Sequence, residues 1–150
     1  MKKLVSVLLC IAMLLSLACV VSAETEETTA PEIVWDENNE TILLEYGATY
    51  GEGEKSFQLV VDHLNQEVVC TVNTDEETVG AALAALNIVA GEDSDYGLMG
   101  NTIDGYTADY NVDGTYWAFY INGDYAMTGV DSTEINEGST YLFQVEGLEL

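Results

Sequence analysis

Asn122 and Gly123 lie between two runs of β-forming residues, YWAFYI before them and DYAM after them. An Asn-Gly pair suits the two positive φ angles of a type I′ turn, which joins the strands of many two-residue β-hairpins. The sequence therefore predicts a tight hairpin with these two residues at its turn. The predicted cross-strand pairs are Ile121 with Asp124, Tyr120 with Tyr125, Ala118 with Met127, and Trp117 with Thr128.

The side chains of this hairpin divide into two faces, because successive residues of a strand point to opposite sides. One face carries Trp117, Phe119, Ile121 and Ala126, and the other carries Tyr116, Ala118, Tyr120, Tyr125 and Met127. Both faces are apolar or aromatic, whereas an antiparallel strand with one solvated face alternates apolar with polar residues. We expect one face to be core and the other to pack under another element or to form a binding surface.

The tyrosine face is the candidate ligand-binding surface. Tyrosine combines a rigid aromatic ring with one hydroxyl, which suits flat or amide-rich ligands. The candidate ligand-binding residues are Tyr116, Tyr120, Tyr125 and Met127, with Tyr96, Leu98 and Met99 of the glycine-rich segment 92–114 at the rim. The alternative is that this face lies under a helix while Trp117, Phe119 and Ile121 face outward, and alternation alone does not decide between the two.

The rest of the chain predicts two more strands, a helix and a further strand. Residues 56–64 and 68–72 alternate apolar and polar side chains and form a second hairpin. Residues 78–88 have helical spacing, with Thr78 as the N-cap or a capping box that begins at Thr74, and with Gly91 at the end. Residues 98–103 are a strand. This order predicts the α+β class: a single small domain, mainly antiparallel sheet with one helix, β-grasp-like.

The N-terminus predicts export from the cell. Lys2 and Lys3 precede an apolar run that ends in Val-Ser-Ala at 21–23, as in a cleaved secretory signal peptide. A membrane span is the alternative reading of this run, and anchoring as a lipoprotein through Cys19 is another. Residues 24–48 form an acidic linker and N-terminal arm. Cleavage after Ala23 removes two of the three cysteines and leaves Cys70 without a disulfide partner.

Charge excludes two classes of partner. The chain has 27 acidic residues against three lysines, no arginine and a formal net charge of −24. Nucleic-acid binding is excluded, because neutralising phosphates takes clustered Lys and Arg. Anionic membranes are excluded as partners for the same reason, and no membrane insertion is expected after signal cleavage. A solvated extracellular surface explains such charge, and cation binding is the alternative.

Neither catalysis nor metal binding has a complete set of residues. Asp109, Asn111 and Asp113 match the opening of a calcium loop, but the twelfth position is Tyr120 where a bidentate Glu is needed. Turn-forming use of Asn, Asp and Gly explains the same residues. We interpret His63 as a surface residue near a turn and Cys70 as a small buried hydrophobe. An enzyme is not expected, because no nucleophile has an activating partner.

Several short motifs resemble one known family. They are Tyr116-Trp117, Phe119 to Gly123, Gly129-Val130-Asp131, Glu137-Gly138 and Tyr141-Leu142-Phe143, and upstream Gly51 to Glu54, Thr74-Asp75, Thr78-Val79-Gly80, Leu83 and Tyr96-Gly97-Leu98. Together they resemble the C-terminal domain of transcobalamin and intrinsic factor, and still more its standalone bacterial versions, many of which are known only as a domain of unknown function. The similarity covers residues 49–146, so we assign the domain to 49–150.

The resemblance implies a secreted, non-catalytic binding module for cobalamin or another corrinoid. In that family the domain covers one side of the corrinoid and a helical domain covers the other. His63 is not expected to be a cobalt ligand, because nothing in the sequence places it near the hairpin. The alternative function is a cell-surface adhesion module that binds proteins or glycans without a corrinoid. Fold resemblance does not decide between them, because function depends on the site.

Overall fold

The described part of the chain is mostly strand. The computed structural model describes residues 40–147 except 64 and 96, and for 93, 94, 97 and 98 it describes the backbone only. Its elements are β1 (Thr49–Tyr50), β2 (Lys55–His63), β3 (Gln66–Thr74), α2 (Val79–Ala85), β4 (Val89–Ser94), β5 (Gly97–Ile103), β6 (Tyr106–Thr107), β7 (Thr115–Ile121), β8 (Asp124–Tyr125), the 3-10 helix η1 (Val130–Ser132) and β9 (Thr140–Gly147). The prediction of an α+β domain with one α-helix is confirmed for these residues.

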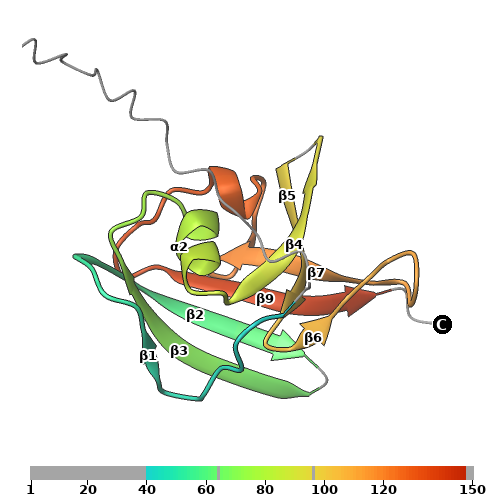
Figure 1. The fold of residues 1–150 in the computed structure, drawn as a ribbon, viewed down its shortest axis with the longest axis horizontal. Coiled ribbons are helices and arrows are strands. Elements are labelled where there is room, and N and C mark those ends of the chain that lie inside the picture. Colours follow the sequence, from blue (N-terminus) through green and yellow to red (C-terminus); the bar gives the residue numbers. More distant parts are fainter. Residues whose placement is uncertain (1–39, 64, 96, 148–150) are drawn as a thin grey trace, which may run out of the picture. The chain divides into compact units, whose positions relative to one another are not determined.

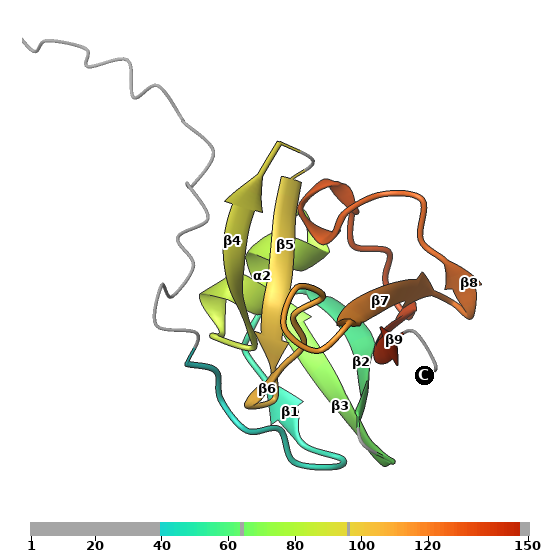
Figure 2. The ribbon, with the colours of Figure 1, turned by 90° about the vertical axis from the view of Figure 1, so that its right-hand side faces the viewer.

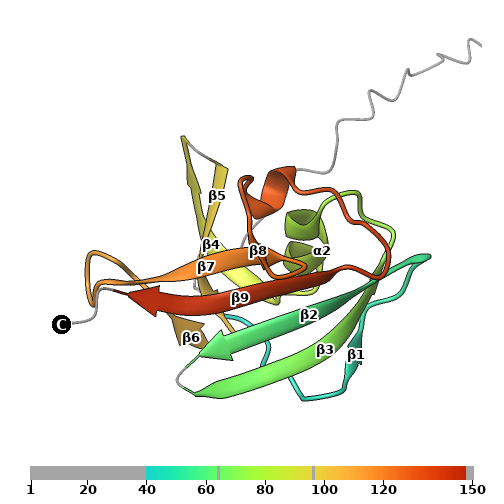
Figure 3. The ribbon, with the colours of Figure 1, turned by 180° about the vertical axis from the view of Figure 1, so that it is seen from behind.

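The strands form a large and a small sheet. The large sheet has the order β1-β3-β2-β9-β7-β8, and Figure 3 shows its long strands side by side. Two of its pairings are parallel, β1 with β3 and β2 with β9, and the others are antiparallel. The small antiparallel sheet has the order β4-β5-β6. It stands with α2 on one face of the large sheet (Figure 1).

Both predicted hairpins form, and each turn has the backbone that its residues favour. Asn122 and Gly123 have φ angles of 51° and 90°, and Ile121 pairs with Asp124 and Tyr120 with Tyr125, as predicted. The pairs of Ala118 with Met127 and Trp117 with Thr128 were wrong. Strand β8 ends after two residues, and β7 instead forms its long ladder with β9. In the other hairpin, β2 begins and ends one residue earlier than predicted, and β3 extends two residues further than predicted at each end.

The helix begins where the sequence predicts and ends earlier. Thr78 Oγ1 accepts a hydrogen bond from Ala81 N–H at 3.3 Å, which confirms Thr78 as the N-cap. The helix ends at Ala85, and Asn87 follows in the left-handed region with a φ of 57°. Two reversed hydrogen bonds close this end, Asn87 N–H to Ala84 O and Ile88 N–H to Leu83 O, which is a Schellman arrangement. The prediction that Gly91 ends the helix was therefore wrong.

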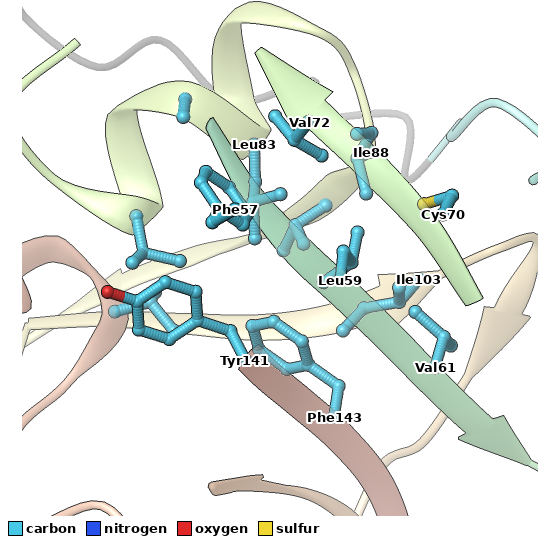
Figure 4. Close-up of a cluster of buried hydrophobic side chains, with 14 of the residues drawn as sticks. Phe57, Leu59, Val61, Cys70, Val72, Leu83, Ile88, Ile103, Tyr141 and Phe143 are labelled. Atoms are coloured by element: carbon cyan, nitrogen blue, oxygen red, sulfur yellow. The ribbon is translucent and has the colours of Figure 1, made fainter. Parts of the chain in front are cut away.

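The core lies between the large sheet on one side and α2 with the small sheet on the other. The buried side chains labelled in Figure 4 come from four strands, the helix and the segment after it. They are Phe57, Leu59, Val61, Cys70, Val72, Leu83, Ile88, Ile103, Tyr141 and Phe143. Tyr141 is fully buried, and its hydroxyl accepts from Asn136 N–H at 3.0 Å and donates to Glu134 O at 3.1 Å. Both polar functions of this core hydroxyl are therefore satisfied.

Candidate functional site

The core decides which face of β7 is inside. Trp117, Phe119 and Ile121 pack against the buried cluster. Phe119 stacks on Phe143 with ring centroids 4.9 Å apart, and Trp117 Nε1–H donates to Asn101 O at 3.1 Å. The tyrosines therefore occupy the outer face of the large sheet, and the alternative in which they lie under the helix is wrong.

A cleft of about 430 Å³ opens beside the inner face of β7. Its walls come from β4 and β5, from the segment before β7, and from the segment that leads into η1; Figure 2 shows these elements around β7. The lining residues are Val89, Glu92, Met99, Gly100, Asn101, Ala108, Asp109, Tyr110, Asn111, Tyr116, Trp117, Phe119, Thr128, Gly129, Val130 and Phe143. We call this space the β7 cleft. Its size and its mixture of aromatic and polar residues suit a ligand site.

The edge of β7 opposite β9 carries backbone groups without a partner among the described residues. Asn122 N–H bonds to Thr140 O on the β9 side, so alternation turns the N–H and C=O of Trp117 and Phe119 to the opposite side. There β8 covers only Tyr120 and Ile121. Phe119 O accepts from Ala126 N–H at 2.9 Å, but Trp117 N–H, Trp117 C=O and Phe119 N–H have no hydrogen bond within the described residues.

Two acids and two exposed apolar side chains form the rim. Glu92 and Asp109 line the cleft, while Met99 is 58% exposed and Tyr110 is 57% exposed. Together these groups favour a ligand with a flat or apolar body that carries hydrogen-bond donors.

The candidate calcium residues form turns. Asp109 Oδ1 accepts from Asn111 N–H at 2.9 Å, and Asp113 Oδ1 accepts from Thr115 N–H at 2.9 Å and from its hydroxyl at 2.6 Å. These bonds lower the pKa of the Asp113 carboxyl below its usual value, because they stabilise the charged form. Within residues 40–147, apart from the two undescribed positions, no three His, Cys, Asp or Glu side chains are grouped to hold a metal ion.

The structure separates the predicted site residues into two groups. Met99 and Tyr116 line the β7 cleft, whereas Tyr120, Tyr125 and Met127 do not. Tyr96 lies outside the described residues, and only the backbone of Leu98 is described. Sequence reasoning missed Tyr110, and it left the side of Trp117 and Phe119 undecided. The sequence does not indicate the free edge of β7, because no turn-forming residue marks the point where β8 ends.

The outer face holds a compact cluster of three tyrosines around one carboxylate. Tyr116 OH donates to Glu146 Oε2 at 3.1 Å, and Tyr120 OH donates to Glu146 Oε1. Tyr125 meets the Tyr120 ring edge to face, with centroids 5.4 Å apart. We call these four residues the tyrosine–glutamate cluster. The hydrogen bonds to Glu146 raise the pKa of Tyr116 above its usual value and that of Tyr120 to about 12.

We predict that Glu146→Gln lowers the Tyr120 pKa toward its ordinary value of 10.0, because the neutral hydroxyl loses its hydrogen bond to a carboxylate and the carboxylate charge no longer opposes ionisation. In the native protein, the neutral form of Tyr120 favours folding. This contribution is complete below about pH 10 and is lost as the pH rises through about 12. Tyrosinate absorbance during an alkaline titration measures the pKa. Glu67→Gln, which removes an exposed charge from the outer end of β3, should leave the curve unchanged, and an equal shift in both variants would disprove the assignment.

His63 is not the surface residue that we expected from the sequence. It is 9% exposed, and its Nε2 lies 3.1 Å from Asp104 Oδ2. Its ring stacks on Tyr106 at 5.2 Å and meets the edge of Trp117 at 6.0 Å, so it does lie beside the aromatic hairpin. No sequence signal indicates this environment, because Asp104, Tyr106 and Trp117 are all distant from His63 along the chain. Within the described part, His63 Nδ1 is buried without a hydrogen-bond partner.

The chain is similar to one protein family and to several solved structures. The model of a family described as "Domain of unknown function (DUF4430)" matches residues 76–147. A crystal structure of a presumed metal-binding protein from Ruminococcus gnavus ATCC 29149 matches with a TM-score of 0.60 and 29% identity, over 64% of this chain and 100% of that one. Haptocorrin in complex with Cbi matches with a TM-score of 0.49 and 19% identity, over 67% of this chain and 27% of haptocorrin. No curated protein matches the sequence.

These matches agree with part of the predicted resemblance. The family match fits the expectation of a domain of unknown function, and the Ruminococcus protein has a similar fold throughout its length. The assignment to the transcobalamin type remains a proposal. None of the described helices is long and apolar enough to cross a membrane. The predicted signal peptide at 1–23 and most of the linker lie outside the described residues.

Proposed function

We propose that this protein is a secreted, non-catalytic module that binds a small ligand in the β7 cleft. The observation that carries the proposal is that Trp117 and Phe119 line the cleft while backbone groups of the same two residues have no hydrogen bond among the described residues. Aromatic surface gives affinity for a flat ligand, and fixed donors and acceptors give orientation. Tyr110 and Met99 at the rim can close over the bound ligand because they are exposed.

The proposed ligand is cobalamin or another corrinoid. The motifs that resemble the transcobalamin type include Tyr116-Trp117 and Phe119 to Gly123, and these residues form β7 and its turn. A corrinoid carries many amide side chains, which can pair with the backbone groups of Trp117 and Phe119. A cleft of about 430 Å³ would take one side of such a ligand, as the resemblance implies. A second protein would then cover the other side.

The absence of catalysis is part of the proposal. Cys70 is buried in β3, and its burial raises the pKa of its thiol to about 11, so it is a poor nucleophile. His63 is held by Asp104 and has no Ser, Thr or Cys hydrogen-bonded to it in the described part of the chain. Secretion rests on the signal-like sequence at 1–23.

We also infer a β-grasp-like topology for the large sheet. Setting β1 aside, its order in terms of chain position is second, first, last, third and fourth, namely β3-β2-β9-β7-β8. The first and last of these strands, β2 and β9, are parallel neighbours, and α2 follows the first hairpin. This arrangement supports the prediction made from the order of elements. The small β4-β5-β6 sheet is an addition inserted between the helix and β7.

The test is calorimetric and visible-absorbance titration of the purified protein with cobinamide and cobalamin, in calcium and then in chelator. We expect saturable binding, weakened about fivefold or more by Tyr110→Ala, because an aromatic ring in a ligand site contributes about 1 kcal/mol or more. Tyr125→Ala is the matched control, since both tyrosines are 57% exposed but only Tyr110 lines the cleft. A folded protein that takes up neither corrinoid would refute the corrinoid assignment and favour the adhesion alternative.

A further inference from the structure

The tyrosine–glutamate cluster is a second surface, separate from the floor of the β7 cleft. It lies on the outer face of the large sheet, where Tyr116 is 39% exposed and Tyr125 is 57% exposed. Between Tyr116 and Tyr120 on β7, Ala118 is only 1% exposed. Its neighbours on the same face therefore cover its methyl group. The two hydroxyls bound to Glu146 hold the rings of Tyr116 and Tyr120 in place, so the surface is ordered before any partner arrives.

The carboxylate of Glu146 has unused hydrogen-bonding capacity. An ionised carboxylate offers about four lone-pair sites on its two oxygens. Tyr116 OH occupies one site on Oε2, and Tyr120 OH occupies one site on Oε1. One site on each oxygen is left for a further donor. A planar group with two parallel N–H donors matches this pattern, whereas a single-point donor uses only half of it.

The rings next to Glu146 favour a cation. The face of an aromatic ring carries negative potential, and a guanidinium group stacks on it while a carboxylate neutralises its charge. Tyr125 stands perpendicular to Tyr120, whose hydroxyl donates to the carboxylate, and the Tyr125 side chain is 57% exposed. The net charge of −24 attracts basic partners to the whole surface and repels acidic ones.

We propose that the tyrosine–glutamate cluster binds the guanidinium group of an arginine on a partner protein. The guanidinium donates two hydrogen bonds to the free lone-pair sites of Glu146 and stacks against Tyr125. Arginine is favoured over lysine because lysine is a compact ammonium that cannot make the parallel pair of bonds. The surface is therefore a docking point for an arginine-bearing segment, distinct from the ligand site proposed for the β7 cleft although Tyr116 takes part in both.

The test is an NMR titration of the purified protein with three capped tripeptides that are identical except for a central arginine, lysine or citrulline. We expect saturable shifts at residues of the cluster with the arginine peptide, and binding at least about threefold weaker with the lysine peptide. Citrulline keeps the shape without the charge and should not bind. Equal affinities for the three peptides, or shifts that map away from the cluster, would overturn the proposal.

Two variants separate the cluster from general attraction to an acidic protein. Glu146→Gln and Glu67→Gln each remove one charge from the outer face, and only the first should weaken arginine binding, by about fivefold. Tyr125→Ala should weaken it as well, whereas Tyr110→Ala should not. Tyr116 is left unchanged because it also lines the β7 cleft. Equal losses of arginine binding in the two Gln variants would mean that binding depends only on the overall charge of the protein. Corrinoid binding should show the opposite dependence on these two tyrosines: Tyr110→Ala should weaken it and Tyr125→Ala should not. The two proposals can therefore be disproved independently of each other.

Discussion

Replacing Asp104 by alanine is expected to lower the free energy of unfolding by about 3 kcal/mol, because it leaves two buried donors without an acceptor. Oδ1 accepts from Leu44 N–H at 2.6 Å, and Oδ2 lies 3.1 Å from His63 Nε2. An ionised carboxylate only accepts, so Nε2 carries the hydrogen. The side chains of His63 and Asp104 are each 10% exposed, which leaves little water to replace the lost bonds. Urea denaturation followed by circular dichroism measures the change.

Two further variants separate these bonds from charge and backbone effects. Asp124→Ala removes the same charge at an exposed position beside the β7 turn, and it should change stability by less than about 0.5 kcal/mol. Asp104→Asn keeps a side chain that tolerates the φ of 52° at this position, and its oxygen can still accept from Leu44, so its cost should be smaller than that of alanine. If alanine cost no more than the exposed control, Asp104 would not be the connection that the structure indicates.

Asp104 also connects parts of the chain that are distant in sequence. It joins the end of β2, through His63, to the arm at Leu44, and the next residue, Gly105, donates its N–H to Thr41 Oγ1 at 2.8 Å. The His63 ring is in turn packed on Tyr106 and Trp117. Loss of Asp104 should therefore loosen the support beneath Trp117 in the β7 cleft, and corrinoid titration of the alanine variant would register that loss.

Gly91→Ala is expected to cost about 3 kcal/mol, because a Cβ at this position would lie 2.1 Å from Met99 O. The clash is with backbone, so no side-chain rotation relieves it. Gly91 lies at the register shift of β4 and pairs with Gly100, and β4 and β5 must approach closely there. The substitution should force the two strands apart, which lowers the melting temperature and distorts the wall of the β7 cleft.

The control is Gly129→Ala, also near the cleft. Its Cβ would lie 2.7 Å from Asp131 Oδ1, the end of a side chain that can rotate away, so we expect a loss below about 1 kcal/mol. Thermal unfolding of both variants tests the comparison. Should the two variants melt at the same temperature, close packing of β4 on β5 would not be the reason for glycine at position 91.

The same glycine shows the limit of sequence reasoning about local structure. In the sequence, Gly91 follows a helical pattern and fits the role of a helix C-terminal residue. In the structure, Asn87 takes the left-handed conformation four residues earlier, and Gly91 is required by a neighbouring strand. Both residues can end a helix, and only the packing of Val89 and Ala90 into a strand decides between them.

The sequence by itself determined the features that depend on neighbours along the chain. The Asn122-Gly123 turn, the two hairpins, the Thr78 cap and the α+β class follow from backbone preferences and from apolar periodicity, which act over a few residues. The burial of Cys70 follows from its position in an alternating strand. Two of the seven candidate ligand-binding residues, Met99 and Tyr116, were also found at the cleft.

Only the tertiary structure decided which hairpin face is inside, where β8 ends and what surrounds His63. Each depends on contacts between residues far apart in sequence: Phe119 with Phe143, Trp117 with Asn101, and His63 with Asp104. Periodicity assigns side chains to two faces but gives both the same apolar character here, so the free energy of burial against α2 and the small sheet makes the choice. For that reason Trp117 and Phe119 face the cleft and Tyr120 faces outward, while Tyr116 takes part in both the cleft and the tyrosine–glutamate cluster.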